Sequence, residues 1–187
     1  MLLIASCRYP ARDLPGAWLQ IDRDRPLRQP DVPYEPSSDR AIGAMLELAA
    51  PHREDVIYDL GCGDGRVVID AVRLSGARGV GVDLDPKLVR LAQANAARAG
   101  VSGHVSFYTR DLFETELREA SVVFLFLWPE INRRLLPKLL RELRPGARIV
   151  SNMHDMGEYA PTRRITLQGG PQPHHVYLWV VPDSAAK

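Results

Sequence analysis

A segment that joins an apolar run to a helical pattern holds the residues with the most informative spacing. The run Val56–Leu60 contains Asp59, and Gly61-Cys62-Gly63-Asp64-Gly65 follows directly. Glycines at alternate positions remove Cβ atoms, so the backbone can turn sharply and come close to a bound molecule. The next helix presents free N–H groups to a negatively charged group. The segment is therefore a candidate ligand-binding loop, although a tight strand-to-helix turn also explains it.

The spacing of these glycines separates two nucleotide-binding patterns. A dinucleotide loop requires G-x-G-x-x-G, but the sixth position counted from Gly61 is Arg66. An acid followed by G-x-G-x-G instead resembles motif I of the class I methyltransferases, which use S-adenosyl-L-methionine. The resemblance implies that Asp59, Gly61, Cys62 and Gly63 bind this cofactor.

The next apolar run, Gly79–Val82, also ends in acidic residues, within Asp83-Leu84-Asp85. A carboxylate at this point can accept hydrogen bonds from both hydroxyls of a ribose. We therefore expect Asp83 to bind the ribose and Leu84 to lie on the adenine face, although Leu84 could equally serve in packing. Asp85 precedes Pro86, which is typical of a helix N-cap.

A third acid follows the run Val105–Tyr108, in Thr109-Arg110-Asp111-Leu112-Phe113. This resembles the Gly-Asp-Leu-Phe segment of the same methyltransferases, with Arg110 in the place of the usual glycine. The resemblance implies that Asp111 accepts a hydrogen bond from the adenine amino group and that Leu112 contacts the cofactor. The alternative is that Asp111 only caps a helix.

The segment Val122–Asn132 lies where this fold places its methyl-acceptor groups, and it lacks the Asn/Asp-Pro-Pro-Tyr sequence linked to nucleobase or glutamine acceptors. Phe126 and Trp128 would suit the aliphatic stem of a lysine, although both could be core residues. Glu130 is a candidate for holding the incoming ammonium, or else a helix-dipole partner. These three residues are the catalytic candidates. His154 and Tyr159 could line the acceptor channel, although a structural role explains His154 more simply.

These residues depend on elements that alternate along the chain. Apolar runs at 56–60, 79–82, 105–108, 122–127 and 148–151 are separated by helical patterns at 67–74, 86–99 and about 130–143, after a first helix that begins near Ser37-Ser38. Runs at 164–167 and 175–181 have no helix between them. The pattern predicts an α/β fold, a three-layer doubly wound Rossmann-like sheet that is mostly parallel and ends in an antiparallel hairpin.

Composition restricts the class of protein. The 187 residues include 24 Lys and Arg against 23 Asp and Glu, so a net charge of +1 gives no overall attraction to nucleic acid or an anionic membrane. No apolar run is long enough to span a bilayer. Cys7 and Cys62 form neither a disulfide framework nor a metal-binding spacing, so we expect no metal and a cytoplasmic location. Ile4-Ala5-Ser6-Cys7 resembles a lipoprotein cleavage site and leaves that alternative open.

The N-terminal 36 residues differ from the rest of the chain. They are rich in proline and arginine and have no sustained periodicity, so we expect an arm over 1–36 and a methyltransferase domain over 37–187.

Several further segments sharpen the resemblance. Asp31-Val32-Pro33-Tyr34-Glu35-Pro36-Ser37, Met45–Ala49, the glycine loop, Pro137-Lys138-Leu139 and Gly146–Ser151 together resemble the small archaeal and mitochondrial protein-lysine methyltransferases of class I. In that family a segment like Tyr34–Ser37 leads into the cofactor site, which implies that Tyr34 and Ser37 close over the methionine end of the cofactor. The expected function is methyl transfer to lysine ε-amines of a protein substrate.

Other functions fit the same fold. The acceptor could be a small molecule, or an RNA that binds the basic arm, although the charge balance disfavours nucleic acid. A catalytically silent cofactor-binding module is the third alternative. The oligomeric state and the identity of the acceptor do not follow from the sequence.

Overall fold

The computed structural model describes residues 28–30, 33–169 and 172–183. Most of the proline-rich arm and the lipoprotein-like segment therefore lie outside the described residues. The helices are α1 (Asp39–Ala49), α2 (Arg66–Ser75), α3 (Pro86–Ala99) and α4 (Pro129–Glu142), with a short 3-10 helix, η2 (Leu112–Glu114). The strands are β1 (Val56–Leu60), β2 (Arg78–Asp83), β3 (Val105–Thr109), β4 (Val122–Leu125), β5 (Arg148–Asn152), β6 (Arg163–Leu167) and β7 (His174–Val180).

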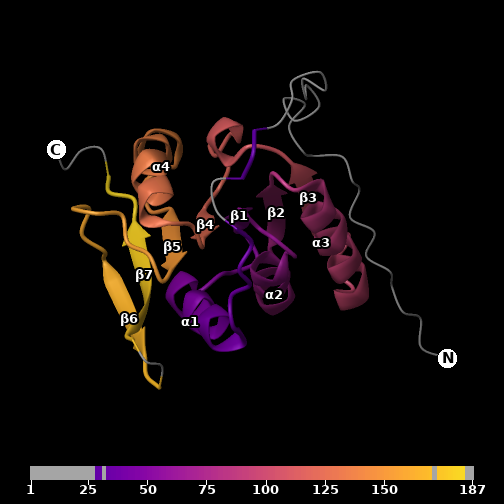
Figure 1. Ribbon diagram of the computed structural model, residues 1–187, viewed down its shortest axis with the longest axis horizontal. Coiled ribbons are helices and arrows are strands. Elements are labelled where there is room, and N and C mark those ends of the chain that lie inside the picture. The colour runs from indigo at the N-terminus through magenta and orange to yellow at the C-terminus, as the bar shows by residue number, and fades with distance from the viewer. Residues whose placement is uncertain (1–27, 31–32, 170–171, 184–187) are drawn as a thin grey trace.

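These strands form one sheet in the order β3-β2-β1-β4-β5-β7-β6 (Figure 1). β1 to β5 pair in parallel, and β7 pairs antiparallel with both β5 and β6. The predicted doubly wound sheet with a C-terminal antiparallel hairpin is confirmed. None of the helices in the described part of the chain is long and apolar enough to cross a membrane.

Two apolar clusters bury the two faces of the sheet and make the three layers. Residues of α1, α2 and α3 pack with Ile57 on one face, and residues of α4 and η2 pack with Tyr58 and Leu60 on the other. Because neighbouring strand residues point to opposite faces, the short apolar strands are buried on both sides. This is why they appear in the sequence as continuous apolar runs.

One predicted strand is too long. The fourth run was expected to extend to residue 127, but β4 ends at Leu125, where it pairs with the last residue of β1, Leu60, and with Ser151 of β5. Beyond this point β1 has turned into the glycine loop, so β4 loses its partner on that side, although β5 continues to Asn152. Phe126 consequently belongs to a loop rather than a strand.

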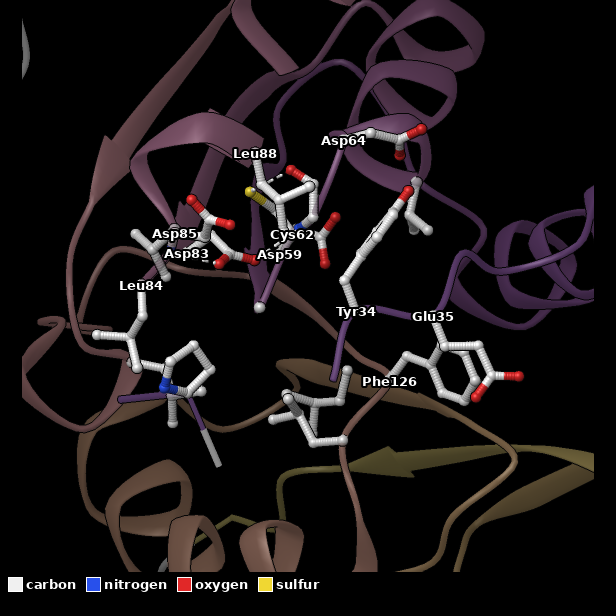
Figure 2. A pocket seen from close by; sticks show the side chains of 18 of the residues that line it. Tyr34, Glu35, Asp59, Cys62, Asp64, Asp83, Leu84, Asp85, Leu88 and Phe126 are labelled. Atoms are coloured by element: carbon white, nitrogen blue, oxygen red, sulfur yellow. Dashed lines mark hydrogen bonds between the residues drawn. The ribbon is translucent and has the colours of Figure 1, made fainter. Parts of the chain in front are cut away.

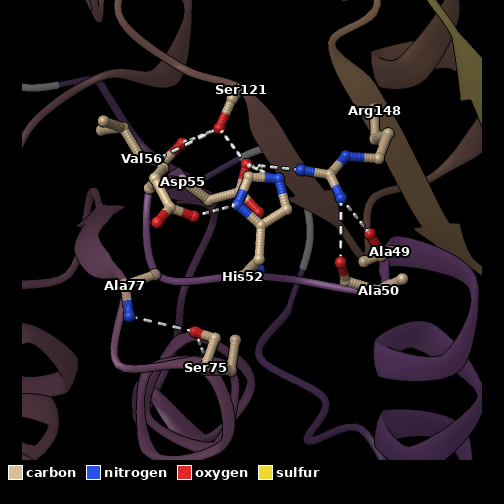
Figure 3. Close-up of polar contacts among 11 residues, drawn as sticks. Ala49, Ala50, His52, Asp55, Val56, Ser75, Ala77, Ser121 and Arg148 are labelled. Atoms are coloured by element: carbon tan, nitrogen blue, oxygen red, sulfur yellow. Dashed lines mark hydrogen bonds and ion pairs between the residues drawn. The ribbon is translucent and has the colours of Figure 1, made fainter.

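A polar network connects the amino-terminal ends of β1, β4 and β5 (Figure 3). The buried Asp55 carboxylate accepts hydrogen bonds from Ser121 Oγ (2.6 Å) and His52 N (2.8 Å), and it pairs with the Arg148 guanidinium. Arg148 also donates to the carbonyl oxygen of Ala49 at the end of α1 (2.7 Å). Together the contacts hold the starts of β1, β4 and β5 against α1.

Candidate active site

A cavity of about 390 Å³ opens at the carboxyl ends of β1, β2 and β4 (Figure 2). Its walls come from the loop after β1, the end of β2, residues 125–127 at and just beyond the end of β4, and the segment before α1. β1 and β4 are neighbours in the sheet, although β2 and β3 lie between them in sequence. The cavity therefore lies where the strand order reverses, which is the usual ligand site of open α/β sheets.

The three glycines of the loop after β1 all have left-handed backbone conformations, with φ of 81° at Gly61, 54° at Gly63 and 79° at Gly65. A Cβ at Gly63 would lie 2.4 Å from Cε2 of Tyr34, and one at Gly65 would lie 2.8 Å from the Phe107 ring. Glycine is therefore required here both by the turn and by close contacts.

The carboxylate of Asp83 lines the cavity and is held by backbone donors. Gly63 N donates to Oδ2 and Asp85 N donates to Oδ1, both at 2.9 Å. Each oxygen retains a further lone pair, so the group can still accept hydrogen bonds from two ribose hydroxyls. Asp85 caps α3 by accepting from Lys87 N (2.7 Å), as its sequence context predicted.

Asp59 is buried on the cavity wall, and its Oδ2 has no hydrogen-bond partner within the described part of the chain. Burial, with further contributions from the nearby charges of Asp83 and Asp64, raises the pKa of this carboxyl to about 7. A buried acceptor without a partner costs free energy, and a cationic ligand would remove that cost. The methionine ammonium of the cofactor fits this position.

Tyr34 and Ser37 hold the segment before α1 against the loop after β1. Ser37 Oγ accepts a hydrogen bond from Asn152 Nδ2 (3.0 Å), and the Ser37 carbonyl accepts from Arg66 Nη1 (3.1 Å). Arg66 also pairs with Asp64 (2.8 Å). Burial of the Tyr34 phenol raises its pKa, and the negative charge of Asp64 raises it further. Tyr34 and Ser37 both line the cavity.

Of the residues expected near the adenine, Leu84 and Leu112 line the cavity and Asp111 does not. Asp111 is buried, pairs with the Arg28 guanidinium and accepts a hydrogen bond from Phe113 N (2.9 Å), so it also caps η2. Cys62 lies on the wall with its thiol buried, and this burial raises the thiol pKa so that it stays protonated.

Of the three catalytic candidates, only Phe126 lines the cavity. Trp128 is half exposed and is the residue before α4, while Glu130 lies in the first turn of α4 and pairs with Arg133 (3.1 Å). Tyr159 packs against the core beside α4, and its carbonyl oxygen accepts from Trp179 Nε1 (2.7 Å).

Several residues that line the cavity were not predicted from the sequence, among them Arg28, Glu35, Asp64, Arg66, Leu127 and Ile131. Asp64 and Arg66 stand within and directly after the glycine loop, so their position offered a signal. Arg28 and Glu35 come from a segment without periodicity, and only the folded chain shows that they meet the cavity.

The arrangement agrees with the predicted cofactor at several independent points. The cavity offers a carboxylate with free acceptor capacity at Asp83, a buried carboxylate lacking a partner at Asp59, and apolar surface at Leu84 and Leu112. These groups match a ribose, an ammonium and a purine ring in chemical character. Comparison with known proteins gives an independent test, because the model of the ANTKMT methyltransferase domain matches residues 59–163.

The chain belongs to this family. It is therefore an S-adenosylmethionine-dependent methyltransferase of class I. The matched region includes the glycine loop, Asp83, Asp111 and the three catalytic candidates. The segment with Tyr34 and Ser37 precedes it.

Relatives of this ANTKMT-family chain include proteins named as lysine methyltransferases. It is 39% identical to a protein-lysine N-methyltransferase of Saccharolobus islandicus over 155 residues, which is 82% of this chain and 96% of that protein. It is 38% identical to the adenine nucleotide translocase lysine N-methyltransferase of Mus musculus over 73% of this chain, and it spans 58% of the mouse protein.

A solved structure is also similar. It is described as an RNA methyltransferase from Salinibacter ruber in complex with S-adenosyl-L-homocysteine, and it is 47% identical with a TM-score of 0.76. The match covers 80% of this chain and 95% of that one. The cofactor product bound in that relative supports the same cofactor for this ANTKMT-family chain.

Proposed function

We propose that this enzyme transfers a methyl group from S-adenosylmethionine to the ε-amino group of a lysine in a protein. The observation that carries the proposal is the chemistry at the end of the cavity formed by Phe126, which combines an aromatic wall with nearby carboxylates. Phe126 stacks on His154, and the charges of Asp155, Glu35 and Glu130 act on that histidine. An alkylammonium side chain suits such a place. The names of the archaeal and mouse relatives support the same acceptor.

In this proposal the cofactor is held by the residues that were predicted from the sequence. Asp83 binds the ribose, Asp59 the ammonium, and Leu84 and Leu112 the adenine. The backbone at Gly61, Cys62 and Gly63 leaves room for the methionine part, over which Tyr34 and Ser37 close. Asp111 acts at the rim through Arg28 rather than from the cavity wall. The bound cofactor supplies an electrophilic methyl group, so the protein's task is to align the acceptor and exclude water.

The catalytic candidates take different places in this proposal. Phe126 flanks the acceptor's aliphatic stem, because it lines the cavity. Trp128 and Glu130 belong to the outer rim, where an exposed indole and a carboxylate can contact the protein that carries the lysine. We place the catalytic domain at 37–187 and extend its site to Tyr34 in the arm over 1–36.

RNA is the second candidate acceptor, because the similar structure from Salinibacter ruber is described as an RNA methyltransferase. The groups around His154 argue against it. Glu35, Glu130 and Asp155 would repel a phosphate backbone, which RNA-binding surfaces normally meet with Lys and Arg.

The test is transfer of radiolabelled methyl from S-adenosylmethionine to a cell lysate by the purified protein, with products separated into protein, nucleic acid and small molecules. We expect base-stable label in protein that maps to lysine, and no label with Asp83→Ala. Asp70→Asn, an exposed aspartate on α2, is the matched control and should behave as wild type. Label confined to RNA or to small molecules would overturn the lysine assignment.

A further inference from the structure

The loop after β5 holds His154 in a fixed position. Its carbonyl oxygen accepts hydrogen bonds from Ser151 Oγ (2.6 Å) and Asn132 Nδ2 (3.3 Å), and its N–H donates to the Asn152 carbonyl (2.8 Å). Asn132 and Ser151 are fully buried, in α4 and β5. Three hydrogen bonds from two elements therefore fix the backbone of His154 and the position of its Cα atom.

The imidazole itself stacks on Phe126, which lines the cavity, while His154 lies behind that ring and outside the lining. The two rings stack with centroids 6.2 Å apart and planes 21° apart, and Phe126 lines the cavity. Neither ring nitrogen of His154 has a hydrogen-bond partner within the part of the chain that the structure describes. By contrast, His174 binds Asn152 and His175 binds Thr166 through their rings. The position is fixed, but the proton-binding nitrogens are left available.

Titratable groups from four segments act on this ring. Glu35 comes from the segment before α1, Glu130 from α4, Asp155 from the same loop, and His174 from β7. Burial is the largest effect and lowers the pKa of His154, while the three carboxylates act in the opposite direction. At neutral pH the imidazole is therefore uncharged and carries a free lone pair, and an imidazolium formed there would have three anions close by.

Methylation of a lysine requires a proton acceptor. A lysine ammonium, with an ordinary pKa of about 10.4, has no lone pair until it loses a proton. The phenol of Tyr34 keeps its own proton, because burial raises its pKa. Asp59 lies in the part of the cavity assigned to the cofactor. Next to Phe126, His154 combines a free nitrogen with a fixed position.

We propose that His154 is the catalytic base that takes the proton from the acceptor lysine. This proposal rests on the proposed lysine methylation and adds a residue role to it. The Nζ–H bond of the ammonium breaks and its proton binds the free imidazole nitrogen. The released Nζ lone pair forms the new N–C bond with the methyl carbon, and the electrons of the broken S–C bond stay on sulfur. The imidazolium then returns its proton to water.

The test is the pH dependence of kcat/KM with poly-L-lysine as the acceptor. If neutral His154 works on the ammonium, kcat/KM of wild type is flat between the His154 pKa and the lysine pKa. His154→Gln must wait for free amine, so its kcat/KM rises by about tenfold per pH unit over that range. Near neutral pH we expect a loss of about 10² to 10³ in kcat/KM.

A merely structural role would lower kcat/KM equally at all pH values and leave the shape unchanged, which would overturn the proposal. His154→Phe keeps an aromatic ring against Phe126 and should reproduce the slope of His154→Gln. His175→Gln, on β7, is the matched histidine control and should keep the wild-type shape. S-adenosylhomocysteine affinity should be the same in all variants.

A second readout does not depend on turnover. NMR titration of the histidine rings, with S-adenosylhomocysteine bound, gives the His154 pKa with and without N-acetyl-lysine amide. The nearby cation should lower the pKa of His154. No response of the His154 ring would overturn the assignment. If the proposed lysine methylation itself is wrong, wild type transfers no label to lysine at any pH. That result differs from both outcomes that would overturn only the role of His154.

Discussion

At the scale of single residues, Asp59 shows how the fold keeps a group ready for a ligand. Its Oδ2 is buried without a partner, and its pKa is raised to about 7 because burial disfavours the charge. The carboxyl therefore binds a proton in the folded chain at a pH where the unfolded chain has lost it. The free energy of unfolding contributed by this group falls as pH rises from about 4 through about 7.

Two consequences can be measured. Because a cationic ammonium requires the carboxylate form, wild-type affinity for S-adenosylhomocysteine should rise between about pH 6 and pH 8. Asp59→Asn should bind at least about tenfold more weakly at the upper pH and lose this dependence. It should also resist urea better than wild type there, since no buried charge forms. A flat wild-type affinity by calorimetry would show that Asp59 does not meet the ammonium.

At the scale of elements, the loop after β1 and the segment before α1 pack closely against each other. Gly63→Ala introduces a Cβ 2.4 Å from the Tyr34 ring and also costs about 1 kcal/mol for its positive φ. We expect a loss of tenfold or more in S-adenosylhomocysteine affinity by calorimetry, about 1.4 kcal/mol. Adding Tyr34→Ala should recover the steric part of the loss. Gly43→Ala in α1, where a Cβ meets nothing within 4 Å, is the matched control.

The network of Asp55 and Arg148 at the amino-terminal ends of the strands stabilises the fold. Arg148→Met leaves the buried Asp55 without its cation, which should lower the free energy of unfolding by about 3 to 5 kcal/mol in urea. The exposed Arg144→Met is the comparison and should change little. The pKa of Asp55 is lowered by its hydrogen bonds and Arg148 despite burial, so its stabilisation is present at neutral pH and is lost as pH falls below about 4. The variant should show a weaker loss over that range.

Elements were predictable where the signal is local. β1 was predicted with its observed bounds, and α3 was predicted from Pro86 to Ala99, because an apolar run and a capped helix are each encoded in neighbouring residues. The end of β4 was not, because it depends on where its neighbour β1 stops. The same holds for Asp111, whose partner Arg28 is 83 residues away in the chain.

At the scale of the whole molecule, the cofactor should stabilise the fold. A ligand at about 100 times its dissociation constant adds roughly 2.7 kcal/mol, which for a chain of this size raises Tm by about 5 to 11 °C. We expect this shift with S-adenosylhomocysteine for wild type and less than half of it for Asp83→Ala at the same concentration. Calorimetric scans measure both. An equal shift in the two proteins would remove Asp83 from the cofactor site.

The reversal of strand order between β1 and β4 divides the enzyme into two working halves. The half with β1 to β3 carries Asp59 and Asp83, whereas Phe126 and His154 follow β4 and β5. We expect that the loops of the second half can be exchanged with those of a relative to change the acceptor while S-adenosylhomocysteine binding is kept, and chimeras joined before β4 would test this.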